Sequence, residues 1–253
     1  MKRIGRGLVA LVAYAGFLAV IAWAVAFLAG APHIASVDGR LRTSSLPAAA
    51  IDIGLLALFG AHHSVMARAG TKRLVARVVS PALERSTYVL VADVLLALVL
   101  WQWQPIRGTV WHVHLPAARA LLWAACGVGW LIAVGATFMI DHFDLVGLRQ
   151  ATSRPDGYAP PAFQVRWLYR WVRHPLMLGL LIAFWITPSM SAGHLLFALA
   201  STVYIALGMS LEERDLMRDL GEPYREYACR VPAVIPRLTR RATSAGRTGL
   251  RRA

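Results

Sequence analysis

Long apolar stretches separated by short polar segments dominate the chain. Four of them, residues 8–30, 46–66, 86–103 and 120–140, hold 18 to 23 residues each and carry few charges. A helix of that length rises about 30 Å, which matches the hydrocarbon core of a bilayer. The pattern therefore predicts a transmembrane helix over each of the four stretches.

A fifth apolar region is divided in two. Residues 175–187 form an apolar stretch of only 13 residues, and the letters T-P-S-M-S lead on to a second stretch at 192–210. Thirteen helical residues reach about 20 Å, which is short for a crossing. Either the first helix begins earlier, near Trp167, or the two stretches form a helical hairpin that turns at Pro188. We expect an all-α bundle of about six transmembrane segments, with the hairpin as the last two.

Composition supports a membrane protein of one domain over residues 1–253. Hydrophobic residues make up 57% of the chain and charged residues 16%, whereas soluble domains carry about 25% charged residues. This composition excludes an ordinary soluble domain and a disordered chain. Asp52 and Asp93 lie within predicted spans, where hydrogen bonding between helices is the expected role.

The basic residues behind the net charge of +14 indicate the membrane topology of the chain and do not indicate nucleic-acid binding. With the N-terminus inside, 23 of the 27 Lys and Arg residues fall in inner segments. Positive charge concentrates on the cytoplasmic side of membrane proteins, so both termini are expected in the cytoplasm, with the chain in the cell inner membrane. The tail 237–253 has six arginines and no acid, which suits attraction to anionic lipids. We expect no nucleic-acid partner.

Two polar segments that flank the divided apolar region carry a paired motif. One reads R-H-P-L-M-L-G at 173–179; the other begins with E-E at 212 and ends with V-P-A-V-I-P at 231–236. The pair resembles the isoprenylcysteine carboxyl methyltransferase and phospholipid methyltransferase superfamily, in which these elements build the S-adenosylmethionine site. The resemblance implies that 141–236 is a cytoplasmic cofactor-binding and catalytic region, following the four spans within 1–140. The cofactor-binding candidates it implies are Arg173, His174, Pro175, Gly179, Glu212, Glu213, Tyr224 and Tyr227.

Two further segments resemble one branch of that superfamily. A-H-H-S-V-M-A-R at 61–68 and H-F-D-L-V-G-L-R-Q at 142–150 are similar to the methanethiol S-methyltransferases. This resemblance implies methyl transfer from S-adenosylmethionine to a small thiol, with methanethiol giving dimethyl sulfide. A lipid or isoprenylcysteine acceptor, or a non-enzymatic membrane accessory protein that keeps the fold, are the alternatives.

The chemistry of S-adenosylmethionine gives these residue types a use. Its carboxylate suits a bidentate pair with Arg173, and a helix that begins at Pro175 adds positive potential. Its ammonium needs a carboxylate, but neighbouring glutamates on a helix point about 100° apart, so only one of Glu212 and Glu213 is expected to face it. The alternative for each residue is an ordinary role at the membrane interface, as an anchor or a solvated helix residue.

The acceptor side is expected near the inner ends of two spans. His62, His63, Asp141, His142 and Asp144 all fall there, and ionisable groups at membrane depth are functional candidates. A thiol reacts as its thiolate, so a base or proton relay is useful. His63 and Asp144 are the favoured catalytic candidates, followed by His62 and Asp141. Adjacent histidines lack the i, i+4 spacing of a helical zinc site, so no metal is expected, and interfacial histidines without a role remain the alternative.

Overall fold

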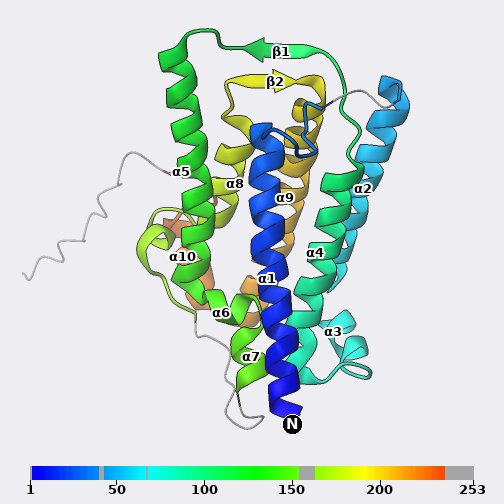
Figure 1. Cartoon of the computed structure of the whole chain (residues 1–253). Helices are drawn as coiled ribbons and strands as arrows, with labels where there is room; N and C mark the ends of the chain where they lie inside the picture. Colours follow the sequence, from blue (N-terminus) through cyan, green and yellow to red (C-terminus); the bar gives the residue numbers. More distant parts are fainter. Residues whose placement is uncertain (1, 40–42, 67, 154–162, 237–253) are drawn as a thin grey trace, which may run out of the picture.

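Six helices run up and down beside one another in the computed structural model, which describes residues 2–39, 43–66, 68–153 and 163–236 (Figure 1). They are α1 (Lys2–Ala29), α2 (Ser45–Met66), α4 (Glu84–Gln102), α5 (Pro116–Ile140), α8 (Pro175–Trp185) and α9 (Ala192–Leu220). The short elements are α3 (Ala69–Val75), η1 (Pro81–Leu83), β1 (Thr109–His112), α6 (His142–Leu145), α7 (Leu148–Thr152), η3 (Trp167–Arg170), β2 (Ser189–Ser191) and α10 (Glu222–Arg230). The expected basic tail 237–253 lies outside the described residues.

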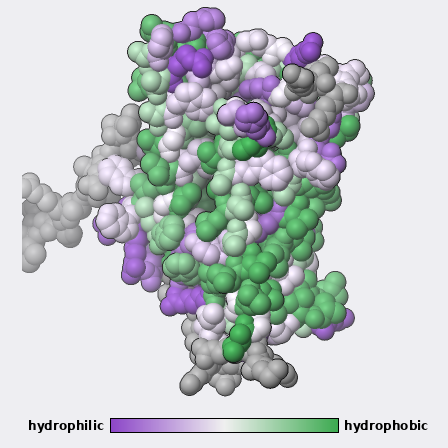
Figure 2. All heavy atoms as spheres, viewed as in Figure 1, coloured by the Kyte–Doolittle hydropathy of each residue, from purple (hydrophilic) through white to green (hydrophobic). Residues whose placement is uncertain are grey.

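The helical bundle is an integral membrane protein. Among the described helices, α1, α2, α5 and α9 are long and apolar enough to cross a bilayer, while α8 is apolar but has only 11 residues. Their outer faces carry exposed apolar side chains such as Leu121, Leu131, Val203 and Leu207, and Figure 2 shows hydrophobic residues spread over the flanks of the molecule. Apolar surface of this extent is typical of contact with lipid.

The divided apolar region forms two helices, not one long helix. Pro175 stands in the first turn of α8, and Trp167 belongs to the separate helix η3. The next helix, α9, begins after Ser191, whose hydroxyl accepts a hydrogen bond from the His194 amide at 3.0 Å. It continues ten residues beyond the expected end at 210, because the sequence E-E-R-D-L-M-R-D consists mainly of good helix formers. The last span and the glutamate pair therefore share one rigid helix.

A two-stranded ribbon is an addition to the otherwise helical fold, at the end of the bundle away from the N-terminus (Figure 1). Strand β1 pairs with β2 in antiparallel fashion, with Thr109 opposite Ser191, and the Trp111 indole donates to the Thr187 carbonyl at 3.0 Å. The ribbon ties the connection between α4 and α5 to the connection between α8 and α9. Strands of three and four residues are too short for an alternating pattern to reveal them.

Helices α5 and α8 pack closely against each other. A Cβ added to Gly179 would lie 2.4 Å from the Ala133 amide nitrogen, and one added to Gly129 would lie 2.7 Å from the Ala183 nitrogen. Two glycines thus let the two backbones touch, as small residues do between helices in membranes. On the other side of the bundle, Asp52 accepts a hydrogen bond from the Gln104 amide at 2.8 Å and joins α2 to the end of α4.

Candidate functional site

A charged cluster forms where α8 begins beside the lower part of α9. One carboxylate oxygen, Glu213 Oε1, lies 2.7 Å from Arg173 Nε, 2.6 Å from Arg173 Nη2 and 3.0 Å from His174 Nε2. The Arg173 and Glu213 side chains are only 12% and 20% exposed. A partly buried ion pair with this many hydrogen bonds holds its members in one geometry. The two sequence motifs, 40 residues apart, therefore meet at a single atom.

Backbone hydrogen bonds fasten the segment after α10 to the start of α8. The Arg173 amide donates to the Pro232 carbonyl at 2.9 Å, and the His174 amide donates to the Ala233 carbonyl at 3.0 Å. These amides precede the first turn of α8, where no helical partner exists for them. The V-P-A-V-I-P element thus packs beside the charged cluster and fixes the backbone of Arg173 and His174.

The Arg173 guanidinium also closes the end of α10. Its Nη1 donates to the carbonyls of Ala228 and Val231 at 2.8 and 2.6 Å, in addition to the contacts with Glu213. Most of its five N–H groups are therefore engaged within the protein. This arrangement makes Arg173 a residue that positions Glu213 and α10.

Glu212 and Glu213 point in different directions, as expected for adjacent residues of a helix. The Glu212 side chain is 53% exposed, and its Oε2 lies 3.7 Å from His174 Nδ1. Glu213, by contrast, is turned inward to Arg173. Of the pair, Glu212 is the carboxylate that remains open to a cation from outside the protein.

Three aromatic rings pack beside the cluster. Tyr224, Tyr227 and Phe163 lie with ring centroids 5.6–5.9 Å apart in edge-to-face geometry. The Tyr227 hydroxyl donates to the Tyr169 carbonyl at 2.7 Å, and Tyr224 is only 1% exposed. Burial raises the pKa of Tyr224 and of Tyr227 to about 12, so both phenols stay neutral over the physiological range. Sequence reasoning missed Phe163, which belongs to no motif.

An open cavity of about 370 Å³ lies between η3 and α10 at this aromatic group. Its lining includes the Phe163 and Tyr227 rings and two guanidinium groups, those of Arg170 and Arg230. Flat aromatic faces and cations suit a planar ring and an anion. Arg170 lies three residues before the R-H-P-L-M-L-G motif, and the sequence pattern gave it no role.

The histidine pair, His62 and His63, lies near the end of α2 and faces α4 and α9. The His62 ring stacks on Tyr88 with centroids 5.9 Å apart, and the His63 ring lies 5.2 Å from Tyr88 and 6.3 Å from Tyr204. Within the part of the chain that the structure describes, Nδ1 of each histidine is buried without a hydrogen-bond partner. Buried polar nitrogens usually have a partner, so this pair is open to a ligand or water.

Asp141 and Asp144, the two aspartates among the predicted catalytic residues, have different surroundings. Asp144 is 2% exposed, and its Oδ2 lies 3.3 Å from Arg85 Nη1. Asp141 precedes α6, accepts a hydrogen bond from the Asp144 amide at 3.1 Å and pairs with Arg149. Asp141 is thus a helix-capping residue, and Asp144 is a buried anion beside an arginine.

His142 is held by the elements around it. Its Nδ1 lies 2.8 Å from the Thr137 hydroxyl, its Nε2 lies 3.1 Å from the Tyr14 hydroxyl, and its ring stacks on Phe138 at 4.0 Å. Burial lowers the pKa of His142. The residue therefore anchors the α5–α6 junction against α1 as a neutral imidazole.

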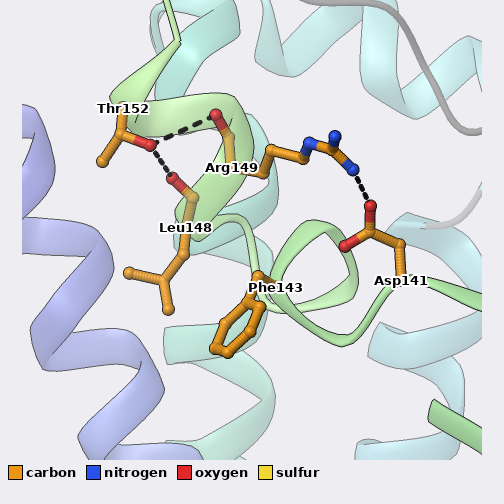
Figure 3. Close-up of a pocket in the computed structure, with 5 residues that line it drawn as sticks. All are labelled: Asp141, Phe143, Leu148, Arg149 and Thr152. Atoms are coloured by element: carbon orange, nitrogen blue, oxygen red, sulfur yellow. Dashed lines mark hydrogen bonds and ion pairs between the residues drawn. The ribbon is translucent and has the colours of Figure 1, made fainter. Parts of the chain in front are cut away.

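A second depression, of about 350 Å³, lies over α6 and α7 (Figure 3). Asp141 and Arg149 close one side, and Phe143 and Leu148 form an apolar side. The Thr152 hydroxyl bonds back to the Leu148 carbonyl at 2.8 Å. The depression is therefore a shallow feature of the surface whose charged groups already pair with each other.

Helix α4 connects the histidine pair with Asp144. Arg85, which pairs with Asp144, and Tyr88, which packs on both histidines, are one helical turn apart.

Two of the predicted cofactor-binding residues, Pro175 and Gly179, lie in the packed part of α8, and Gly179 contacts α5. In the described residues, no three His, Cys, Asp or Glu side chains gather as they would around a metal ion.

Comparison with known proteins gives close relatives over most of the chain. It is 45% identical over 225 residues to the methanethiol S-methyltransferase of Mycobacterium tuberculosis, covering 88% of this chain and 92% of the relative. It is 46% identical over 236 residues to methanethiol S-methyltransferase 2 of Bradyrhizobium diazoefficiens, covering 91% and 90%. Nurim of Bos taurus is 31% identical over 178 residues, 65% of this chain and 66% of that protein. No protein-family model and no solved structure matches the chain.

Proposed function

The chain belongs to the methanethiol S-methyltransferase family, and from that premise we propose that it methylates methanethiol to dimethyl sulfide with S-adenosylmethionine as donor. The observation that carries this proposal is the 45% identity over 92% of a methanethiol S-methyltransferase. The thiol sulfur forms a bond to the methyl carbon as the carbon–sulfonium bond breaks, the bond's electron pair stays on the departing thioether sulfur, and the thiol proton is released.

The residues at the lower end of α8 and α9 suit the donor. The open Glu212 carboxylate would take the ammonium beside His174, and Arg170 at the cavity would take the carboxylate. Phe163 and Tyr227 would flank the adenine. Arg173 would act by fixing Glu213 and the segment after α10.

The acceptor side would be formed by the histidine pair and Asp144. His63, with a buried nitrogen free of other bonds, is the favoured group for accepting the thiol proton. Asp144, paired with Arg85, would contribute to the electrostatic potential around the thiol. His62 would act through its packing on Tyr88, and Asp141 through the cap it forms on α6. Water exclusion matters because a thiolate that keeps its hydration shell attacks slowly.

Six crossings with both termini in the cytoplasm complete the proposal. Figure 1 shows α4 and α8 running alongside the four long apolar helices. The 23-to-4 distribution of basic residues supports this orientation. The tail 237–253 would then face anionic lipid headgroups. A reporter fused after residue 236 should be active only in the cytoplasm, and activity only outside would overturn the orientation.

The activity is tested by incubating purified protein with S-adenosylmethionine and methanethiol and measuring dimethyl sulfide in the headspace. His63→Ala and Asp144→Asn should each lower turnover at least about tenfold, roughly 1.4 kcal/mol of barrier, with donor affinity retained. Phe143→Ala, an exposed neighbour on α6, is the matched control. Absence of dimethyl sulfide together with methylation of an isoprenylcysteine or lipid would replace the proposed acceptor.

A further inference from the structure

Two large aromatic side chains stand exposed at the short helix η3. Trp167 begins this helix and is 75% exposed, and Trp171 caps its end and is 57% exposed. The two residues are about one helical turn apart. Paired apolar side chains that are exposed in this way usually mark a contact with another surface. We call them the tryptophan surface.

The packing of α8 on α5 fixes the level of this surface along the bundle. Gly179 lies against Ala133, and Gly129 lies against Ala183, so the two helices run antiparallel. Four residues back from Gly179, Pro175 begins α8, and four residues forward from Ala133, α5 enters its last turn. The start of α8 is therefore level with the last turn of α5.

The lipid-facing flank of the bundle reaches this same level. On the last turn of α5, Phe138 and Ile140 are 55% and 58% exposed, and they continue the apolar face that Leu131 forms at 73% exposure. Trp171 is four residues before Pro175, so it lies within about 14 Å of the start of α8. The tryptophan surface therefore adjoins the lower edge of the lipid-facing flank.

Helix α10 marks the aqueous side of the same region. The Tyr227 hydroxyl donates to the Tyr169 carbonyl at 2.7 Å and fastens α10 to η3. On α10, the Glu222 and Glu226 side chains are 68% and 58% exposed and pair with arginines of the same helix. Exposed charges such as these need water around them. Helix η3 thus lies between a lipid-facing helix and a water-facing helix.

The residues of η3 suit the boundary between lipid and water. Arg166 and Arg170 directly precede the two tryptophans in the sequence, and both arginines are exposed. Tryptophan is enriched at the headgroup level of membranes, and arginine is attracted to the phosphates of lipids. Arg170 also lines the cavity beside α10, which leaves Arg166 as the arginine for a lipid phosphate.

We propose that the tryptophan surface binds the headgroup region of the bilayer, with Arg166 on a lipid phosphate, so that η3 contacts the membrane in addition to the spanning helices. The cavity of about 370 Å³ between η3 and α10 then opens at the level of the headgroups and not in bulk water. The inference does not depend on the methyl acceptor, and it stands or falls separately from the proposed function.

Spin labels on the full chain in lipid nanodiscs test this placement, with both native cysteines replaced by serine. The labelled variants are Trp167→Cys and Trp171→Cys, with Leu131→Cys as the lipid reference and Glu226→Cys as the water reference. Collisions with oxygen, which concentrates in lipid, and with a water-soluble nickel chelate are measured. Labels at 167 and 171 should meet the chelate about threefold less often than the label at 226, because lipid excludes it, yet more often than the label at 131.

Each other pattern of collisions overturns the inference. If the chelate reaches 167 and 171 as often as it reaches 226, the tryptophan surface lies in water. If neither oxygen nor the chelate reaches the two labels, protein covers the surface, either a second copy of the chain or the segment 237–253. If the chelate reaches them as rarely as it reaches 131, η3 lies in the hydrocarbon core and not among the headgroups.

A second measurement keeps the native side chains, because each label replaces a tryptophan. Emission is compared between the wild type and a double variant, Trp167→Phe with Trp171→Phe, which removes two of the nine tryptophans. The nanodiscs contain lipid brominated close to the headgroup, which quenches nearby tryptophan. Most of the emission that the double variant lacks should be emission that this lipid quenches, with Tm unchanged. If that emission is not quenched, the tryptophans do not contact the bilayer and the inference is wrong.

Discussion

Removing the Arg173 side chain should unfold the protein more easily even without any ligand. Arg173→Ala deletes the contacts with Glu213 at 2.6 and 2.7 Å and leaves the carbonyls of Ala228 and Val231 without donors. Breaking a buried ion pair by removing one partner costs about 3–5 kcal/mol. Because Glu213 is 20% exposed and can gain some water, the lower end, about 3 kcal/mol, is expected.

Unfolding in detergent without S-adenosylmethionine, followed by tryptophan fluorescence, measures this effect. Arg218→Ala removes a 65% exposed arginine from the same helix as Glu213 and should leave Tm unchanged. Arg173→Lys should behave like the alanine variant in part, since lysine keeps the charge but not the forked geometry. If Arg173→Ala melts like the wild type and loses only donor affinity, then Arg173 is a direct cofactor ligand and the positioning role is refuted.

Three further outcomes are expected. Gly179→Ala should cost about 1–3 kcal/mol by overpacking, because its Cβ would lie 2.4 Å from a backbone nitrogen; an unchanged Tm would contradict the packing role, and Gly127→Ala is the control. Tyr227→Phe should lose about 0.5–1.5 kcal/mol with the hydrogen bond to the Tyr169 carbonyl, and a melting curve identical to the wild type would rule this out. Because the pKa values of Tyr224 and Tyr227 rise from 10.0 to about 12, their contribution to stability is complete below pH 10 and is lost as pH rises through 12. Tyrosinate absorbance should show the same range, and ionisation of both near pH 10 in the folded protein would be inconsistent with their burial.

The sequence predicted α1, α2, α5 and α9 because length and hydropathy alone identify helices that can cross a bilayer. Pro175 marked the beginning of α8 correctly, since proline suits a first helical turn. The end of α9 was placed ten residues early, because a drop in hydropathy at 210 ends an apolar stretch without ending a helix. Hydropathy depends on the medium around a helix, whereas the end of the helix depends on the helix propensity of its residues.

The candidate site was predicted less completely. The meeting of His174 with Glu213 was predictable from paired motifs, and the structure brings them to 3.0 Å. Phe163 and Arg170 could not be found, because neither has a partner close in sequence that would mark it. Gly179 was assigned to the cofactor, but its face is decided by where α5 lies. Spacing along one helix says which residues share a face, but not what that face meets.

The backbone bonds from Arg173 and His174 to Pro232 and Ala233 also determine when the site can exist. A chain emerging from the ribosome inserts its spans in order, so α8 and α9 are made before their closing segment. The amides at the start of α8 therefore have no hydrogen-bond partner until carbonyls about 60 residues downstream are synthesised. Nascent chains that stop before residue 231 should insert into the membrane but lack the carbonyls that bind the amides at the start of α8. Synthesis of the protein thus ends, in functional terms, only when this last segment docks.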